Sequence, residues 1–167
     1  MKMKIGLAAL VTALLLLPGI AQADELPMKA EAPITLTSPS AILCEASTGQ
    51  VIFEKNADER RPVASVNKVM TILLTLEAVD EGRVSLEDQV TVSPRAASMG
   101  GSQAFLDAGE RYKLSELLKT VIVASANDSA VALAEHLAGT EESFVRLMNT
   151  RAEELGLTNT HYANCTG

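Results

Sequence analysis

From Ser65 onward, apolar residues recur at intervals of three and four, and this periodicity limits most of the chain to amphipathic helices. The first helix is predicted to begin near Ser65 and to end before Gly82. Its apolar positions are Val66, Val69, Met70, Leu73 and Leu74. A soluble helix with such a stripe has to bury it against other elements, so the rest of the chain has to supply a core.

Further helices are predicted over about residues 114–123 and 128–137. A last helix is opened by Thr140 as a capping residue and closed by Gly156. One face of this last helix is expected to consist of Phe144, Leu147, Met148 and Leu155. Residues 83–110 contain several Gly and Pro residues and are expected to be mainly loop with one or two short elements.

Two short apolar runs precede the helices. Residues 41–45 and 51–55 flank the turn Ser47-Thr48-Gly49-Gln50, which predicts a β-hairpin. Strands followed by a series of helices are typical of the α+β class. An isolated hairpin is marginal, so further strands are expected beside it.

The N-terminus has the pattern of a secretory signal peptide over residues 1–23. Lys2 and Lys4 precede an apolar stretch, and Ala21-Gln22-Ala23 is a small-residue cleavage site. We therefore expect export to the cell envelope, either the periplasm or the outer side of the cytoplasmic membrane. Residues 24–39 are predicted to be an irregular lead-in, and residues 40–167 the folded domain.

Charge and composition exclude some functions. The net charge is −7, and loss of the two N-terminal lysines makes it more negative, which argues against a nucleic acid partner. His136 and His161 have no Cys or His at ligand spacing, so no metal site and no cofactor are expected. Cys44 and Cys165 either pair in a disulfide or remain two separate thiols, and the sequence leaves both alternatives open.

Ser65-Val66-Asn67-Lys68 places a hydroxyl and an ammonium at positions i and i+3 of the first helix, on one face. A serine needs an adjacent base to act as a nucleophile, and a lysine can be that base if its pKa is lowered. Val66, Val69 and Met70 are expected to surround Lys68 and to lower its pKa by desolvation. The alternative is a capping serine followed by a surface lysine, because the pattern alone is common.

Ser125-Ala126-Asn127 lies between two predicted helices, where a connecting loop can present both polar side chains. The pattern Ser-x-Asn is also common, and Ser125, Asn127 or Asp128 can simply start the following helix. Asp128 is assigned mainly to that capping role.

The ordered set of these segments resembles the D-alanyl-D-alanine carboxypeptidases, the low-molecular-mass penicillin-binding proteins. The resemblance covers about residues 33–167. The matching segments are Pro62–Thr71, Glu45–Val51, Met99–Gln103, Ser125–Asp128 and Asn164–Gly167. It implies a β-lactamase/transpeptidase-like fold, here an N-terminal hairpin plus the helical subdomain without the later strands of the sheet.

The resemblance also implies acyl transfer on peptidoglycan pentapeptide stems. Ser65 would attack the carbonyl between the two terminal D-alanines, and Lys68 would accept its proton. Ser125 would relay a proton to the leaving amine, and Asn127 would bind the substrate amide or Lys68. β-Lactam antibiotics, which mimic the D-Ala-D-Ala end, would acylate Ser65.

The family's third motif, Lys-Thr-Gly, does not occur in the sequence. Lys119-Thr120-Val121 is no substitute, because it falls inside a predicted helix. The resemblance therefore implies a fragment without the substrate carboxylate clamp and without the C-terminal segment by which family members often reach the membrane. A fragment of this kind is expected to be nearly inactive, since loss of one oxyanion donor alone costs on the order of a hundredfold.

Three alternatives predict different chemistry. A class A β-lactamase would release penicillin rapidly, although no clear Glu-x-x-Leu-Asn segment is present. A non-catalytic penicillin-sensing or peptidoglycan-binding module would stay acylated without releasing D-alanine. A secreted helical domain with coincidental motifs would not be labelled by penicillin at all.

Overall fold

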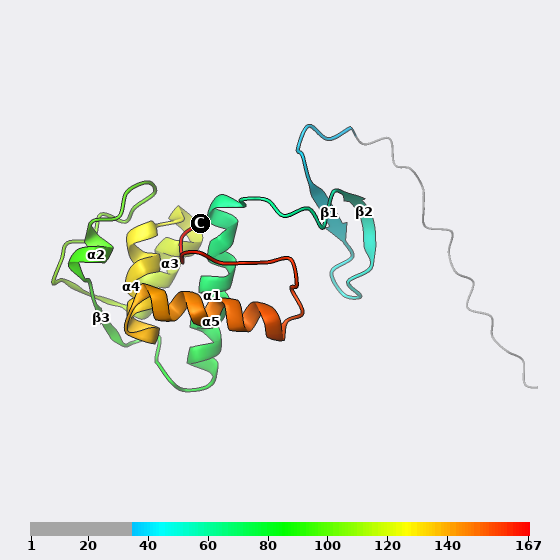
Figure 1. Cartoon of the computed structure of the whole chain (residues 1–167). Helices are drawn as coiled ribbons and strands as arrows, with labels where there is room; N and C mark the ends of the chain where they lie inside the picture. The colour runs from blue at the N-terminus through cyan, green and yellow to red at the C-terminus, as the bar shows by residue number, and fades with distance from the viewer. Residues whose placement is uncertain (1–34) are drawn as a thin grey trace, which may run out of the picture. The chain divides into compact units, whose positions relative to one another are not determined.

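The computed structural model describes residues 35–167 (Figure 1). The predicted signal peptide, residues 1–23, and most of the predicted lead-in lie outside the described residues. The chain divides into two compact units, the first ending at Lys55 and the second running from Asn56 to Gly167.

The first unit contains the predicted hairpin. β1 (Ala41–Cys44) pairs antiparallel with β2 (Val51–Lys55), and Ala41 lies opposite Lys55. The Glu45 carboxylate accepts the backbone N–H groups of Ser47 and Thr48 at the turn, together with both hydroxyls. These hydrogen bonds lower the pKa of Glu45 to about 2, and the bond from the Thr48 hydroxyl has the largest effect. The lead-in is tied to this hairpin, because Lys55 Nζ donates to the carbonyls of Leu36 and Ser38, each at 2.8 Å.

The second unit is mainly helical. In chain order it consists of η1 (Ala64–Asn67), α1 (Lys68–Asp80), β3 (Gln89–Thr91), α2 (Pro94–Ala97), β4 (Arg111–Lys113), α3 (Leu114–Ala124), α4 (Asn127–Ala138) and α5 (Glu141–Glu154). The predicted helices are confirmed within a few residues at each end. Thr140 is the N-cap of α5, as expected, and its hydroxyl accepts the Ser143 N–H.

α4 is the centre of this unit. Residues 130–134 are each at most 1% exposed, and α4 contacts α1, α2, α3 and α5. The alanines of this run let neighbouring helices approach closely, while larger side chains from α3 and α5 fill the remaining space. These are Leu114 and Leu117 from α3, and Phe144 and Met148 from α5.

One strand of this unit was not predicted, and one expectation about α5 was wrong. β3 and β4 form a small antiparallel sheet, with Val90 opposite Tyr112, where β4 was not predicted as a strand. On α5, Leu147 and Leu155 are each 44% exposed, and Ala152 lies in the core with Phe144 and Met148. The buried face of α5 is therefore narrower than its apolar pattern indicated.

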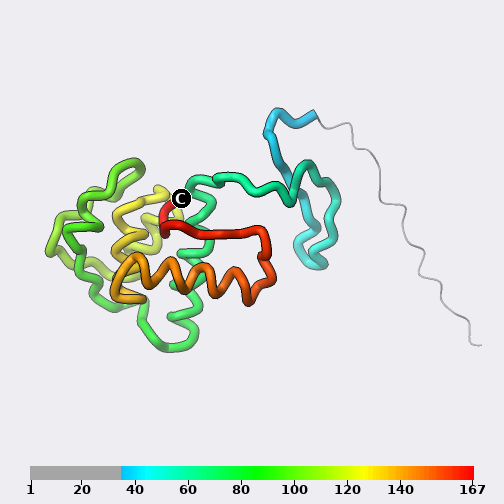
Figure 2. Tube along the Cα trace, in the orientation of Figure 1, coloured from blue at the N-terminus to red at the C-terminus, as the bar shows by residue number. Residues whose placement is uncertain are grey.

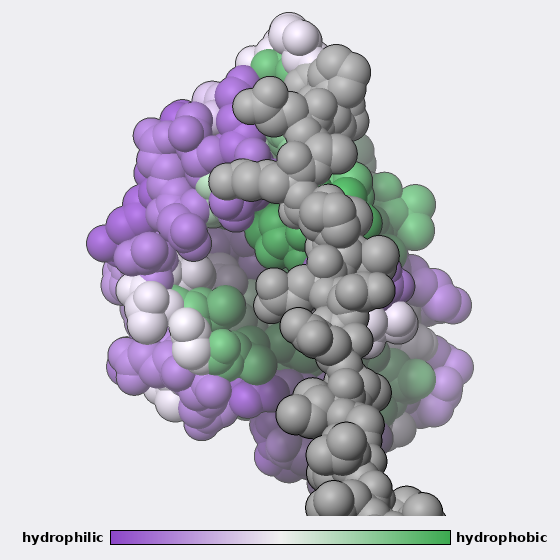
Figure 3. Space-filling model, turned by 90° about the vertical axis from the view of Figure 1, so that its right-hand side faces the viewer, coloured by the Kyte–Doolittle hydropathy of each residue, from purple (hydrophilic) through white to green (hydrophobic). Residues whose placement is uncertain are grey.

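No helix among residues 35–167 combines the length and the hydrophobicity that crossing a membrane requires. Some hydrophobic side chains lie at the surface of each unit, and Figure 3 shows hydrophobic patches between hydrophilic ones on the face that it presents. Cys44 is exposed and Cys165 is buried, and both are free thiols.

Candidate active site

Ser65 and Lys68 lie where the helical segment begins. The first turn, η1, is a 3₁₀ helix that continues directly into α1, and Ala64 has a positive φ of 48°. A non-glycine residue in this region is strained, and such strain is common at functional sites. Lys68 Nζ lies 3.1 Å from the exposed Ser65 Oγ, so the predicted contact is confirmed.

Lys68 is 2% exposed and takes part in no ion pair among residues 35–167. Its Nζ donates to the Thr166 carbonyl at 3.0 Å. Burial without a carboxylate partner lowers the pKa of Lys68. A lysine in this state is suited to accept the proton of a neighbouring hydroxyl.

The source of this burial differs from the expectation. Val66 is 67% exposed and Val69 is 64% exposed, whereas Met70 is 4% exposed. Residues i+1 and i−2 of a helix point to different sides from residue i, so Val66 and Val69 do not cover Lys68. The C-terminal segment, through Thr166, lies against Lys68 instead.

Ser125 is held in an unusual conformation at the turn between α3 and α4. It is the C-cap of α3 in the left-handed region, with φ 55°, and its Oγ is buried without a hydrogen-bond partner. Both features cost free energy, because serine favours other backbone conformations and a buried hydroxyl normally has a partner. Helices α3 and α4, which flank this turn, both contact α1.

Asn127 is tied to the segment around Gly101. Its N–H donates to the Ser102 carbonyl and its side-chain amide to the Gly100 carbonyl, each at 2.7 Å. A Cβ on Gly101 would lie 2.8 Å from the Asn127 amide nitrogen, and Gly101 has φ 82°, so only glycine fits. Among the described residues no hydrogen bond joins Ser125 or Asn127 to Ser65 or Lys68; two separate clusters are formed.

Asp128 has a role that the sequence did not indicate. It is 2% exposed, and its carboxylate accepts the N–H groups of Ala104 (3.0 Å), Leu106 (3.1 Å) and Ser129 (2.8 Å). The bond from Ser129 is not a helix cap, because the N-cap of α4 is Ala126 and no side chain caps this helix, so the expected capping role of Asp128 is wrong. The other two fasten the loop after Gly101 to the Ser125–Asn127 turn, and no sequence signal shows this.

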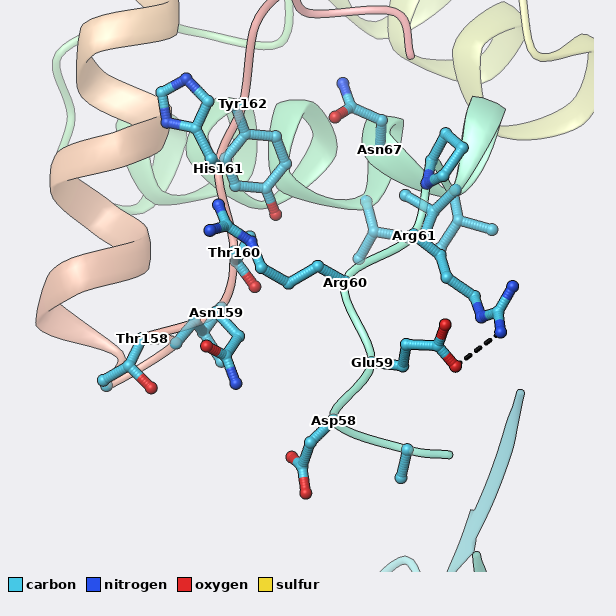
Figure 4. A pocket seen from close by; sticks show the side chains of 17 residues that line it. Asp58, Glu59, Arg60, Arg61, Asn67, Thr158, Asn159, Thr160, His161 and Tyr162 are labelled. Atoms are coloured by element: carbon cyan, nitrogen blue, oxygen red, sulfur yellow. Dashed lines mark hydrogen bonds and ion pairs between the residues drawn. The ribbon is translucent and has the colours of Figure 1, made fainter. Parts of the chain in front are cut away.

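A cavity of about 770 Å³ lies beside the η1–α1 junction (Figure 4). It is lined by residues 57–63, by Val66, Asn67 and Val69, and by residues 156–162, and Arg60 extends across it toward Thr160 and Tyr162. It includes neither Ser65 nor Lys68. The Ser65 and Lys68 pair therefore lies outside the lining of this cavity.

An exposed serine beside a buried lysine that has few hydrogen-bond partners, on an α+β scaffold with a strained Ser-x-Asn turn, is typical of the Ser-x-x-Lys class of serine enzymes. The model of the D-alanyl-D-alanine carboxypeptidase family, peptidase S11, matches residues 27–167. The chain belongs to this family.

Curated relatives agree. D-alanyl-D-alanine carboxypeptidase DacF of Bacillus subtilis is 51% identical over 128 residues, covering 77% of this chain and 33% of the relative. DacC of Escherichia coli K12 is 39% identical over 144 residues, covering 80% of this chain and 36% of the relative. The chain thus spans about a third of the length of the curated relatives it matches.

Solved structures show the same fold. The carboxypeptidase DacD of Francisella tularensis superposes with a TM-score of 0.79 at 37% identity, over 80% of this chain and 32% of that one. Penicillin binding protein 5 of Haemophilus influenzae gives a TM-score of 0.78 at 33% identity, over 81% and 40% of the two chains. The expected fold class, α+β of the penicillin-binding protein and transpeptidase type, is confirmed.

Proposed function

We propose that the protein is a serine-type D-alanyl-D-alanine carboxypeptidase that acts on peptidoglycan stem peptides through an acyl-serine intermediate. The observation that carries this proposal is the 3.1 Å contact between Ser65 Oγ and the Nζ of a lysine that is 2% exposed. Membership of the carboxypeptidase family supports the choice of substrate.

In this mechanism Ser65 Oγ attacks the carbonyl carbon between the two terminal D-alanines while its proton passes to Lys68. The tetrahedral intermediate collapses, and Ser125 relays a proton to the leaving D-alanine amine. Water then hydrolyses the ester bond to Ser65. Asn127 binds the substrate amide, and its side-chain donor to Gly100 fixes its orientation.

Export through the N-terminal signal peptide and a location in the cell envelope belong to the same proposal. They rest on the sequence pattern of residues 1–23 and on the substrate, which lies outside the cytoplasmic membrane. β-Lactams are the expected inhibitors, since they acylate the same serine.

The test measures the complete gene product in two assays: release of D-alanine from a peptide ending in D-Ala-D-Ala, and labelling by a fluorescent penicillin. Ser65→Ala should abolish both. Ser98→Ala, an exposed serine whose hydroxyl donates only to the nearby Arg95 carbonyl, is the matched control and should retain both.

Other outcomes distinguish the alternatives. Rapid release of the penicillin label would indicate a β-lactamase. Lasting acylation without D-alanine release would indicate a penicillin-sensing module. A protein that is not labelled at Ser65 would contradict the proposal altogether.

A further inference from the structure

Residues Asn164–Gly167, here called the strap, lie beside the start of α1 (Figure 2). Its successive carbonyls accept hydrogen bonds from side chains at the η1–α1 junction. These bonds run to Asn164 from Asn67 (2.9 Å), to Cys165 from Thr71 (2.9 Å) and to Thr166 from Lys68 (3.0 Å). Lys68 is thus one of three side chains that donate hydrogen bonds to the strap.

The strap has a defined shape of its own. The Asn164 side-chain oxygen accepts the N–H groups of Thr166 (3.0 Å) and Gly167 (2.5 Å), which folds the segment into a tight turn. Gly167 has φ 85°, and a Cβ there would lie 1.9 Å from the Ala64 carbonyl oxygen. The close approach of the strap to the residue before Ser65 therefore requires glycine.

The contact between Thr71 and Cys165 anchors the middle of the strap. Both residues are 0% exposed, so water cannot reach either group. If this hydrogen bond were lost, the hydroxyl and the carbonyl would both remain without a partner. The Cys165 thiol lies 3.5 Å from a Glu141 carboxylate oxygen. Burial is the main reason why the pKa of the thiol is raised, and the negative charge of Glu141 is the second. Cys165 therefore stays neutral beside Lys68 and does not form an ion pair with it.

A neutral lysine amine has two N–H groups and one lone pair, and it can take the proton of Ser65 only when the lone pair faces Oγ. We propose that the strap orients Lys68: the Thr166 carbonyl accepts one N–H of the neutral amine, which directs the lone pair to Ser65, and Thr71 fixes that carbonyl through Cys165. During acylation the O–H bond of Ser65 breaks and a third N–H bond forms on Lys68. Thr71 is then a positioning residue that touches neither substrate nor nucleophile. This inference rests on the proposed function.

The test compares Thr71→Val with Thr71→Ser in the complete gene product. Valine keeps the branched shape and removes the hydroxyl, whereas serine keeps the hydroxyl and loses a methyl group. The acylation rate constant and the non-covalent dissociation constant for a fluorescent penicillin are measured separately. Thr71→Val should lower the rate constant on the order of tenfold to a hundredfold, because small misplacements of a catalytic group have effects of this size. Its dissociation constant should stay unchanged, and Thr71→Ser should retain a rate close to that of the wild type.

Equal rates for Thr71→Val and the wild type would overturn the proposal, and so would equal losses in both variants, since these would indicate packing alone. If Thr71→Val does not fold, Asn164→Ala takes its place: loss of the Oδ1 acceptor should lower the same rate constant, and an unchanged constant refutes the strap's role. A wild-type protein that is not acylated at all would contradict the proposed function instead, so the two failures are distinguishable.

Discussion

Lys68 combines two properties that are rarely found together: it is buried, and no carboxylate in the described part of the chain pairs with it. A buried ammonium is costly, and the hydrogen-bond partners of Lys68 are only one backbone carbonyl and one hydroxyl among the described residues. Burial lowers the pKa of Lys68 from its ordinary value of 10.5. This shift raises the fraction of Lys68 that is unprotonated, which is the form that the proposed mechanism requires.

Acylation of Ser65 by penicillin should therefore rise with pH through the pKa of Lys68, with a midpoint below 10.5. The sign follows because only the neutral amine accepts the proton. Rates of labelling of the complete gene product over a pH series measure it. Lys68→Arg keeps the positive charge at all these pH values and should lose on the order of a hundredfold or more in rate, since general-base catalysis contributes about that much. A midpoint at or above the ordinary lysine value would refute the role of Lys68 as the base.

At the scale of elements, the loop around Gly101 and the α3–α4 turn behave as one structure. Asn127 donates to the carbonyls of Gly100 and Ser102, and the Asp128 carboxylate accepts the N–H groups of Ala104 and Leu106. The first two residues of α4 therefore bind the loop in both directions, since Asn127 donates hydrogen bonds to it and Asp128 accepts hydrogen bonds from it. Two short segments distant in sequence keep each other in place.

Asp128→Asn should release this loop. Both carboxylate oxygens of Asp128 accept backbone N–H groups. In asparagine one of these oxygens is replaced by an NH₂ group, which would face a backbone N–H donor. We therefore expect the free energy of unfolding to fall by about 1–3 kcal/mol. Urea unfolding of the chain measures the loss, and hydrogen exchange should show faster exchange of the Ala104 and Leu106 amides. Asp107→Asn, on the same loop at an exposed position, is the control and should change neither. Unchanged exchange at both amides in Asp128→Asn would contradict the assigned role.

At the scale of the whole molecule, the helical unit is organised around α4, whose residues 130–134 are buried on all sides. Helices α1, α2, α3 and α5 each contact it. The elements that carry Ser65 and Ser125 are therefore positioned by one core, and the stability of that core decides whether the site is assembled.

Leu133→Ala should cost about 2–5 kcal/mol, because Leu133 is fully buried and the surrounding helices cannot close the cavity. Leu76→Ala on α1, at a side chain that is 45% exposed, is the matched control and should cost far less. Thermal unfolding of both variants followed by circular dichroism compares them. Similar shifts in the two unfolding midpoints would show that α4 is not the centre of the cooperative unit.

The sequence determined those features that depend on neighbouring residues. The hairpin and the four long helices follow from apolar periodicity and from turn and capping residues. The contact between Ser65 and Lys68 also follows, because positions i and i+3 of a helix are adjacent in any fold. The ordered motifs were enough to indicate the family.

The tertiary structure alone decided the environment of these residues. Lys68 is hydrogen-bonded to Thr166, which lies 98 residues further along the chain, whereas the neighbouring valines are exposed. Asp128 fastens a loop 22 to 24 residues before it, and β3 and β4 are too short to show a periodicity of their own. Local patterns specify which elements form, whereas burial and hydrogen-bond partners come from contacts between distant segments, which a periodicity does not encode.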